Sequence, residues 1–309
     1  LEEMTFADLK MPIDPLYEPS ITVEESKTYM NDALAVMGED YLDMVNRAFS
    51  ERWIDFAQNE GKSTGAFCAS PYRGSSFILI SWTGSMEDVF VLAHELGHAG
   101  HFYHANQEQN LFNYEASLYF IEAPSTMNEM LMANHLLKNS EDPKFKRWVL
   151  SSIVSRTYYH NFVTHLLEAA FQRKVYERVD AGGNVNATIL NELKRGVLEE
   201  FWGDTVTLNE GAELTWMRQP HYYMGLYPYT YSAGLTVSTE MAQRVLKEGD
   251  PAVKDWLNVL RAGGSKNPAE LANMAGIDIT TDKPLRDTIT YIGDLIEQIE
   301  KLTEEIEAQ

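Results

Sequence analysis

The sequence has little cysteine, little positive charge and no long apolar run. A single cysteine, Cys68, stands among 309 residues, so no disulfide can form within the chain. This usage fits a reducing compartment, and we expect a cytoplasmic protein. Only 25 basic residues offset 46 acidic ones, for a net charge of −21. Such a surface repels phosphate backbones and anionic lipids, so neither nucleic acid nor a membrane is expected as a partner. No segment approaches the roughly 20 apolar residues that span a bilayer.

The residues that are present have the pattern of a helical globular protein. Hydrophobic residues make up 44% of the chain and charged residues 23%, which is ordinary for a folded domain. Residues 1–24 should form an extended lead-in, and residues 25–309 a single, mostly helical region that begins with helical periodicity over 24–59. Glycine and proline clusters separate the later helices. These helices are expected at 85–106, 113–138, 142–180, 186–203, 232–248, 250–262, 267–275 and 283–307.

One strand is expected directly before a sharply capped helix. Residues Ser76–Trp82 combine aromatic and β-branched side chains between turn signals, as strands do. Ser85 and Asp88 then form a capping-box pattern, in which Asp88 reaches back to the backbone amide of Ser85. The expected fold is therefore mainly α, with a small patch of strand before one particular helix.

That helix carries the sequence His94-Glu95-Leu96-Gly97-His98. The two histidines are four residues apart, which places both imidazoles on one face, where they can reach a single ion. A zinc ion in this setting lowers the pKa of a bound water to about 7 and polarises a carbonyl, and a neighbouring carboxylate can take the water proton. The motif therefore predicts a zinc site with Glu95 as the general base. The alternative for this pattern is a helix whose histidines are solvated or satisfied in the core.

A third metal ligand has to come from another part of the chain. Glu115, Glu122 and Glu129 recur at heptad spacing on the next predicted helix. All three would lie on one face, so spacing alone does not choose among them. Pro124 would open the helix locally, which slightly favours Glu122.

A rival third ligand is His104, because its spacing in the sequence from His94 and His98 matches the ligand spacing of metzincins. Metzincins need a glycine where this chain has His101, so that the helix breaks and the third histidine swings back. Nothing ends the helix here, and we exclude His104. We interpret His101 as a neighbour of the ligands or a packing residue. The remaining histidines have no partner pattern and are expected to be ordinary helix residues: His135, His160 and His165.

Further segments accompany the metal motif across the chain. They are Gly61–Cys68, Pro71-Tyr72, Asp88–His98, Glu122–Glu129, Pro220–Tyr223, Ser265–Pro268 and Ala275–Asp278. Together they resemble the oligoendopeptidase F branch of the thimet-oligopeptidase family. The resemblance extends over nearly the whole chain, and this combination is more specific than the metal motif alone.

The resemblance implies a gluzincin-type centre with one zinc ion per chain. The ligands would be His94, His98 and Glu122, with Glu95 as the base. Glu129 would orient a ligand imidazole from outside the coordination sphere. A phenol or imidazole opposite the metal would stabilise a developing oxyanion. The residues implied for that role are His221 and one or two of Tyr227, Tyr229 and Tyr231.

The strand before the metal helix has an expected part in substrate binding. In peptidases of this type an edge strand pairs with an extended peptide and recognises its main chain. An internal strand is the alternative for this segment. The candidate residues are Ser76, Phe77, Ile78 and Leu79.

The activity implied by the resemblance is hydrolysis of internal bonds in short, unstructured peptides by zinc-activated water. Members of the family are about twice this length, and their helical N-terminal half forms the opposite wall of a deep channel. That half is expected to be absent here, and a separate piece that completes the channel is a candidate partner. The alternative is a truncated, inactive remnant that binds peptides or only keeps the scaffold.

Overall fold

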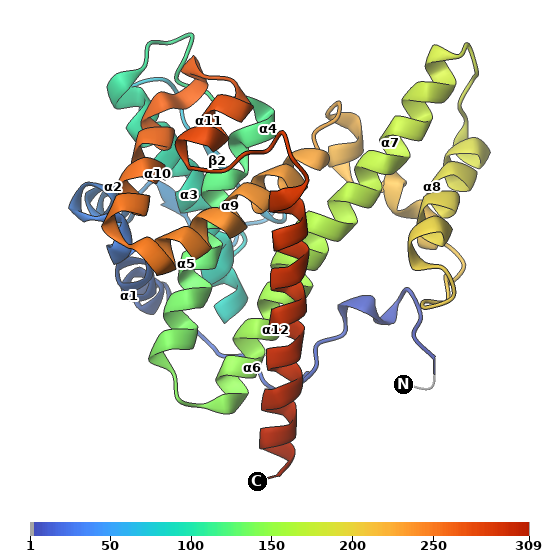
Figure 1. Cartoon of the computed structure of the whole chain (residues 1–309), viewed down its shortest axis with the longest axis horizontal. Helices are drawn as coiled ribbons and strands as arrows, with labels where there is room; N and C mark the ends of the chain where they lie inside the picture. The colour runs from blue at the N-terminus through green and yellow to red at the C-terminus, as the bar shows by residue number, and fades with distance from the viewer. Residues whose placement is uncertain (1–2, 309) are drawn as a thin grey trace.

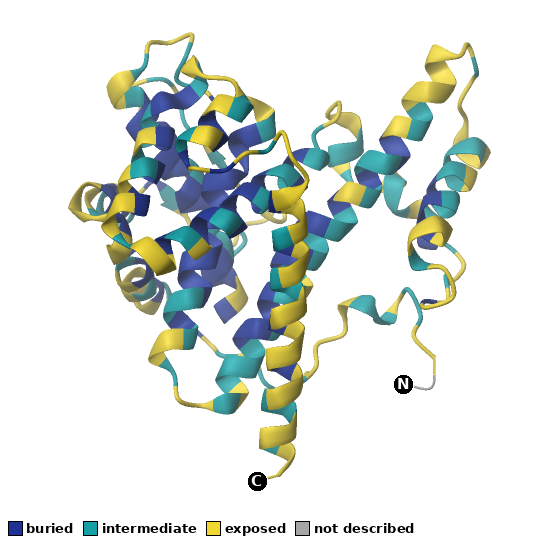
Figure 2. Ribbon diagram, viewed as in Figure 1, coloured by how far each residue is buried: buried dark blue, intermediate teal, exposed yellow. Residues whose placement is uncertain are grey.

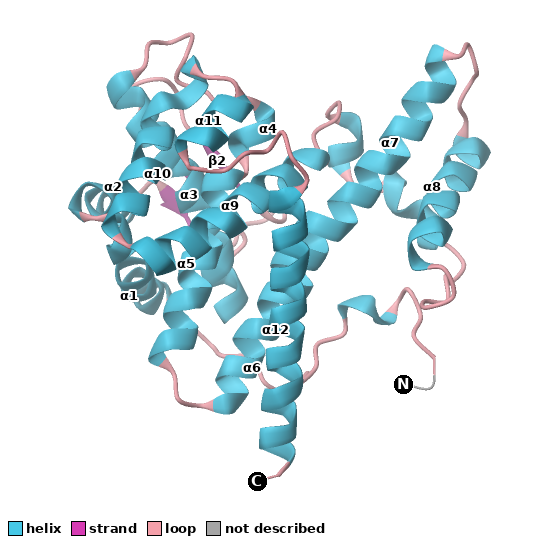
Figure 3. Ribbon diagram, viewed as in Figure 1, coloured by secondary structure: helices cyan, strands magenta, loops and turns pink. Residues whose placement is uncertain are grey.

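Helices form nearly all of the regular structure in the computed structural model, which describes residues 3–308 (Figure 1, Figure 3). The predicted mainly α fold with a small patch of strand is confirmed. The α-helices are α1 (Val23–Leu34), α2 (Glu39–Ser50), α3 (Met86–Glu108), α4 (Leu118–Ile121), α5 (Ala123–Asn139), α6 (Pro143–Ser152), α7 (His165–Asp180), α8 (Ala187–Trp202), α9 (Tyr229–Glu248), α10 (Asp250–Ala262), α11 (Pro268–Met274) and α12 (Lys283–Glu307). A π-helix, η3 (Ile153–Thr164), joins α6 to α7, and a short 3-10 helix, η5 (Pro220–Tyr223), precedes α9. The strands are β1 (Ile54–Asp55), β2 (Ala66–Ala69) and β3 (Phe77–Ile80).

The first helical stretch is divided and is shorter than its periodicity predicts. Gly38, with a φ of 89°, separates α1 from α2 in a conformation that glycine adopts without strain. Helix α2 ends at Ser50, and β1 then pairs with β3 through Ile54 and Asp55. The prediction of helix as far as residue 59 is therefore wrong, because strand pairing overrides the local pattern.

Two later helices also differ from their predicted form. The helix expected over 113–138 starts only at Leu118 and is interrupted at Glu122. The helix expected over 142–180 is continuous, but its middle part is the π-helix η3. Both differences lie next to the predicted metal site, and both affect which side chains reach it.

The helix with the two histidines runs through the core of the bundle. Helix α3 packs against α5 and α10, and α5 packs against α9; Figure 2 shows this part of the molecule as the most buried. The predicted apolar stripe of α3 is fully buried at Val89, Leu92 and Leu96. Helix α12 lies outside, against α6 and α9. Helices α7 and α8 project from the bundle and are largely exposed or half-buried (Figure 1, Figure 2).

The small sheet has the strand order β1-β3-β2. Strand β3 pairs with β1 in parallel and with β2 antiparallel, so both of its backbone edges are occupied. The prediction that Ser76 to Leu79 form an edge strand is therefore wrong, and the alternative of an internal strand is confirmed. The hydroxyl of Ser76 is buried and bonded to that of Ser70 at 2.7 Å, whereas the side chain of Phe77 is exposed. The strands at the two edges are β1 and β2.

The described part of the lead-in, residues 3–22, crosses the outside of the bundle in a largely extended form (Figure 1). Thr5 forms an isolated bridge with Thr207, and Ser20 forms one with Ser85 at the start of α3. One 3-10 turn, Asp8–Lys10, lies between these points. None of the helices between residues 3 and 308 has the length and apolar character needed to cross a membrane.

Candidate metal centre and the cleft around it

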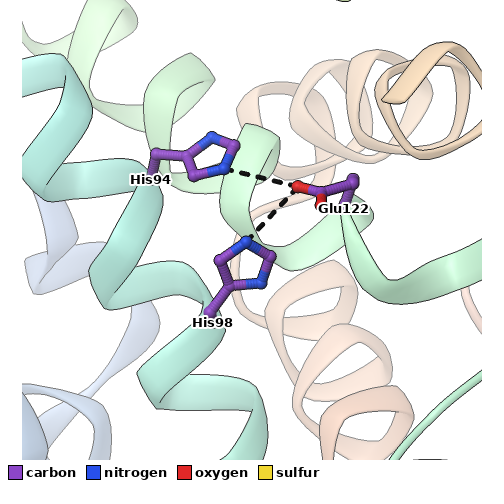
Figure 4. Close-up of side chains that lie close together, drawn as sticks. All are labelled: His94, His98 and Glu122. Atoms are coloured by element: carbon purple, nitrogen blue, oxygen red, sulfur yellow. Dashed lines mark ion pairs between the residues drawn. The ribbon is translucent and has the colours of Figure 1, made fainter. Parts of the chain in front are cut away.

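Helix α3 presents His94 and His98 from one face, one turn apart (Figure 4). The helix begins as predicted, since the carboxylate of Asp88 accepts from the backbone N–H of Ser85 at 3.2 Å. The two imidazole rings lie 5.0 Å apart. The Nε2 atom of each ring lies 3.3 Å from the same Oε2 atom of Glu122. The structure therefore brings the two predicted histidines and one of the three candidate acids together.

Glu122 lies at the interruption between α4 and α5. Pro124 stands in the first turn of α5, where its missing N–H costs no helical hydrogen bond. Two glycines let neighbouring helices approach this point. A Cβ atom on Gly97 of α3 would lie 2.4 Å from the carbonyl oxygen of Pro124. One on Gly234 of α9 would lie 2.7 Å from the carbonyl carbon of Glu122. The backbone at Glu122 is thus held between α3 and α9.

The three side chains fit a zinc ion by donor type and by spacing. His94, His98 and Glu122 each offer one ligand atom within 4.8 Å of the other two. Imidazole nitrogen and carboxylate oxygen bind zinc at about 2.0–2.2 Å, and in a tetrahedral site such donors lie about 3.3–3.6 Å apart. The separation of 3.3 Å between Glu122 and each histidine agrees with this value. The group can therefore hold a metal ion and leave a fourth position open.

Mutual attraction controls the charges of this group. Burial would raise the pKa of Glu122, but His98 and His94 outweigh it and lower that pKa well below its usual range. Burial would lower the pKa of His94, but its hydrogen bonds to Glu122 and Glu129 raise that pKa well above its usual value. Glu122 is thus ionised, as a metal ligand must be, and a bound cation would displace the proton that His94 otherwise takes up.

Glu129 holds His94 through the other ring nitrogen. Its Oε1 atom lies 2.6 Å from Nδ1 of His94, which leaves Nε2 directed at Glu122. Thr157, from η3, donates its hydroxyl to Oε2 of Glu129 at 2.6 Å. A carboxylate bonded in this way fixes the ring and the tautomer of a metal-binding histidine. The contact has the geometry expected for Glu129 from the resemblance.

Glu95 lines a cleft of about 680 Å³ together with His94, His221 and Tyr231. Its side chain is buried, and its Oε2 atom has no hydrogen-bond partner among residues 3–308. Burial raises the pKa of Glu95 above its usual range, although the neighbouring His94 acts in the opposite direction. A carboxylate with a free oxygen and a raised pKa can accept a proton near neutral pH.

Two tyrosine hydroxyl groups link the ligand Glu122 to His221 through hydrogen bonds. Tyr227 donates its hydroxyl to Oε1 of Glu122 at 2.6 Å. Tyr231 donates to the hydroxyl of Tyr227 at 3.2 Å, and its oxygen lies 3.3 Å from Nε2 of His221. Three of the four predicted oxyanion donors therefore meet beside the metal group.

Tyr229 is not brought to this group. It is the first residue of α9, and residues two apart on a helix do not face each other. The ring of Tyr229 packs on Tyr119 instead, with 5.8 Å between the centroids.

A family model described as Peptidase family M3 matches residues 16–291 of this chain. The chain belongs to peptidase family M3. It is 28% identical over 302 residues to oligopeptidase PepF of Bacillus subtilis, and 30% identical over 283 residues to the plasmid oligoendopeptidase F of Lactococcus lactis subsp. cremoris. These alignments cover 98% and 91% of this chain, but 45% and 47% of the relatives. The chain thus spans about half the length of the curated relatives it matches.

Solved structures share the fold of this M3 chain. A Chlamydophila abortus protein assigned as a peptidase superposes with a TM-score of 0.81 at 26% identity, over 98% of this chain and 50% of its own. Oligoendopeptidase-F from Enterococcus faecium gives a TM-score of 0.69 at 21% identity, over 99% and 47%. At that identity the second likeness concerns the fold alone. The predicted resemblance to the oligoendopeptidase F branch is confirmed by the curated relatives.

Other candidates on the M3 chain lie away from the metal ligands. Glu115 is exposed and outside the ligand group. Helix α3 continues to Glu108 without a break at His101, so the metzincin arrangement with His104 does not occur. Both of these histidines are buried, with no hydrogen bond to either ring nitrogen among residues 3–308. Burial lowers the pKa of His101 to about 3 and that of His104 to about 4. His101 stacks on Phe102 at 5.9 Å, so of its two predicted roles the structure supports packing.

The sequence interpretation missed a polar cluster behind Tyr231. His165 was expected to be an ordinary helix residue, but it is fully buried and bonded to Glu168. Its ring lies 4.6 Å from that of His160. Residues five apart lie on different faces of an α-helix, whereas in η3 the backbone N–H of His165 bonds to the carbonyl of His160, which aligns the two rings. Apolar periodicity does not signal a π-helix. The three-residue spacing of His165 and Glu168 was the available signal.

Proposed function

We propose that this chain is the catalytic region of a zinc metalloendopeptidase that hydrolyses internal bonds of short, unstructured peptides. The observation that carries the proposal is the zinc-like donor spacing of His94, His98 and Glu122, next to the buried carboxylate of Glu95. Membership in peptidase family M3 supports a peptide substrate. We propose one zinc ion per chain, since residues 3–308 contain one such ligand group.

Glu95 is the proposed general base. Zinc held by the ligand group would supply Lewis acidity and lower the pKa of a water molecule. Glu95 would take the proton from the attacking water and pass it to the leaving amine. Its unpartnered Oε2 atom can receive that proton, and the raised pKa suits the transfer. Glu129 and Thr157 would keep His94 in the tautomer that directs Nε2 at the ion.

Tyr231 and His221 are the proposed donors to the oxyanion, because both line the cleft. Donors placed where charge develops typically contribute about 2.7–4 kcal/mol to transition-state stabilisation. Tyr227 donates to Glu122 and accepts from Tyr231. We therefore assign Tyr227 to the alignment of a metal ligand with a donor.

The substrate main chain is proposed to pair with β2 in place of β3. Strand β2 is at one edge of the sheet, and Gly65 and Ala66 line the same cleft as Glu95. Pairing along a strand edge recognises peptide backbone with little demand on sequence. A helical region corresponding to the remainder of the longer relatives is the proposed partner that completes a channel around this cleft.

The cytoplasm is the proposed compartment. The chain has one cysteine and so no internal disulfide. Burial raises the pKa of the Cys68 thiol to about 12, which keeps it protonated and unreactive.

The test compares the native chain with Glu95→Gln on quenched fluorescent peptides, before and after chelation and zinc add-back. We expect both proteins to bind one zinc ion, and kcat of the variant to fall roughly 10²–10⁴-fold. The control is Glu87→Gln, which changes another acid of the same cleft. Glu87 pairs with Arg156 at 3.3 Å and is about half exposed, so activity should persist.

Zinc binding without cleavage of any peptide by the native chain would contradict the proposal. That result would favour the peptide-binding remnant. Equal activity of the native chain and Glu95→Gln would remove Glu95 from its role.

A further inference from the structure

A buried imidazole–carboxylate pair, His165 and Glu168, lies next to Tyr231 and has no part in the proposed metal chemistry. The Nδ1 atom of His165 lies 2.6 Å from Oε2 of Glu168, and the two residues are 0% and 3% exposed. The His165 ring stacks on that of Tyr231, with 4.2 Å between centroids and 16° between planes. It also lies 5.2 Å from the ring of His221. His165, the imidazole of the pair, thus lies against both proposed oxyanion donors.

We propose that His165, fixed by Glu168, is a positioning residue for Tyr231 and His221. The stack sets the plane and the depth of the Tyr231 ring, whose hydroxyl must reach both Tyr227 and His221. An oxyanion donor has to lie about 2.7–3.1 Å from the developing charge, and a displacement of about 1 Å can cost roughly 100-fold in rate. The inference rests on the proposed function, because it concerns a donor of that reaction.

The packing of η3 against α9 fixes the distance between the stacked rings. Ser232, the neighbour of Tyr231, donates to the carbonyl oxygens of Asn161 and Phe162 at 3.1 and 3.3 Å. His165 follows at the end of the π-helix, where its N–H bonds to the carbonyl of His160. The two hydrogen bonds of the Ser232 hydroxyl thus tie α9 to η3 next to the stacked rings of Tyr231 and His165.

Packing alone does not account for the pair. The Nε2 atom of His165 is buried and has no partner among residues 3–308, and an unpaired buried polar atom costs stability. Glu168 is also buried. Burial lowers the pKa of Lys194, and the negative charge of Glu168 acts in the opposite direction. An apolar side chain would fill the same space without these costs. The polar pair instead provides a flat ring held in one orientation, as an aligned donor requires.

The kinetic test uses His165→Leu, His165→Phe and Glu168→Gln in the full chain loaded with zinc. In His165→Leu we expect kcat to fall on the order of 10- to 100-fold, with KM nearly unchanged and one zinc ion retained. The smaller effect is expected in His165→Phe, which keeps a flat ring but loses the bond to Glu168. A loss confined to kcat marks an interaction made in the transition state.

The matched control is His104→Leu. His104 is also 0% exposed, and it stacks on Tyr41 with 5.7 Å between centroids and 20° between planes. It lies outside the metal and donor groups, so its replacement should lower the melting temperature without lowering kcat. A merely structural role for His165 would make the two leucine variants behave alike.

A second measurement observes Tyr231 without any turnover. The chain has 16 tyrosines, so 3-fluorotyrosine labelling needs the Tyr231→Phe variant to assign the Tyr231 resonance by ¹⁹F NMR. We expect that resonance to shift in His165→Leu, where the stacked ring is lost, and to stay in place in His104→Leu.

The two measurements separate the outcomes. A shifted resonance with lowered kcat supports the proposal. An unshifted resonance, or native kcat in His165→Leu, Phe and Glu168→Gln, overturns it while the peptidase function stands. A native chain that binds zinc and cleaves nothing overturns the proposed function, and the positioning role with it.

Discussion

The two sides of the cleft are built differently. On the side of the proposed metal ligands, α3 carries His94 and His98, Glu122 lies at the junction of α4 and α5, and every residue from Ile121 to Ala133 is buried. On the donor side, His221 belongs to η5, a short helix with no buried residue. The ligand side is therefore positioned by close backbone packing. The donor side is positioned by side chains that stack and share hydrogen bonds.

This difference predicts which kinds of substitution should disturb the metal ligands and which should disturb the oxyanion donors. A metal ligand set needs its donor atoms fixed within a few tenths of an ångström, which a packed backbone provides. Oxyanion donors are needed only as charge develops, and a stacked ring can hold them. Loss of a ligand or displacement of the backbone that holds it should therefore disturb the ligand side, whereas loss of a stacked or hydrogen-bonded side chain should disturb the donor side alone.

The largest effect is expected from removal of the carboxylate ligand. Glu122→Ala should weaken zinc binding by on the order of 10³-fold or more, well beyond the roughly 10–100-fold loss typical of an outer hydrogen-bond partner. Competition with a chromogenic chelator measures this affinity. The control is Glu115→Ala, which removes the exposed acid one heptad earlier and should leave zinc affinity unchanged. Native affinity in Glu122→Ala would mean that another group binds the ion.

A smaller loss, restricted to turnover, is expected on the donor side. Tyr231→Phe removes the hydroxyl that reaches Tyr227 and His221 and keeps the stacked ring. We expect kcat to fall roughly 10²–10³-fold, as for other single oxyanion donors, at unchanged zinc affinity. A phosphinic peptide that mimics the tetrahedral state should lose affinity in parallel. If zinc affinity fell with kcat, the two sides would not be separable.

The sequence predicts the ligand side better than the donor side for physical reasons. The four-residue spacing of His94 and His98 is local, because an α-helix fixes it. Spacing alone left Glu122 as one of three acids, and the family resemblance was needed to choose it, since its position depends on an interrupted helix and on close approach by Gly97 and Gly234. Those approaches join segments far apart in the chain.

The donor side was predicted only in part. The tyrosines and His221 were predicted as oxyanion donors only from a family resemblance. Their partner His165 was missed because a π-helix changes which residues share a face. The edge strand was also misplaced, since nothing local to Ser76–Leu79 shows that strands pair with it on both sides.

A backbone change at Gly234 tests the ligand side directly. In Gly234→Ala the added Cβ would lie 2.7 Å from both the backbone nitrogen of Ala123 and the carbonyl carbon of Glu122, so the helices must move apart. Overpacking of this kind costs about 1–3 kcal/mol of folding stability, and we expect zinc affinity to fall about 10-fold as Glu122 is displaced. Gly196→Ala in α8, where no atom lies within 4 Å of the added carbon, should gain about 0.5–1 kcal/mol. Denaturant melts and chelator competition measure the two quantities. Native zinc affinity in Gly234→Ala would show that the ligand side does not depend on this approach.

The smallest effect is expected at Tyr229, which shares the tyrosine-rich segment but not its geometry. Its ring packs on Tyr119, while Tyr227 and Tyr231 meet beside Glu122. Tyr229→Phe keeps that ring contact and removes only a hydroxyl, so kcat and KM should stay within about 2-fold of native values, as for a change outside the transition-state contacts. A loss comparable to that of Tyr231→Phe would mean that α9 turns on substrate binding and that the donor side is not preformed. Native kinetics in Tyr229→Phe beside a large loss in Tyr231→Phe would show that stacking and hydrogen bonding, and not membership of the segment, select the donor.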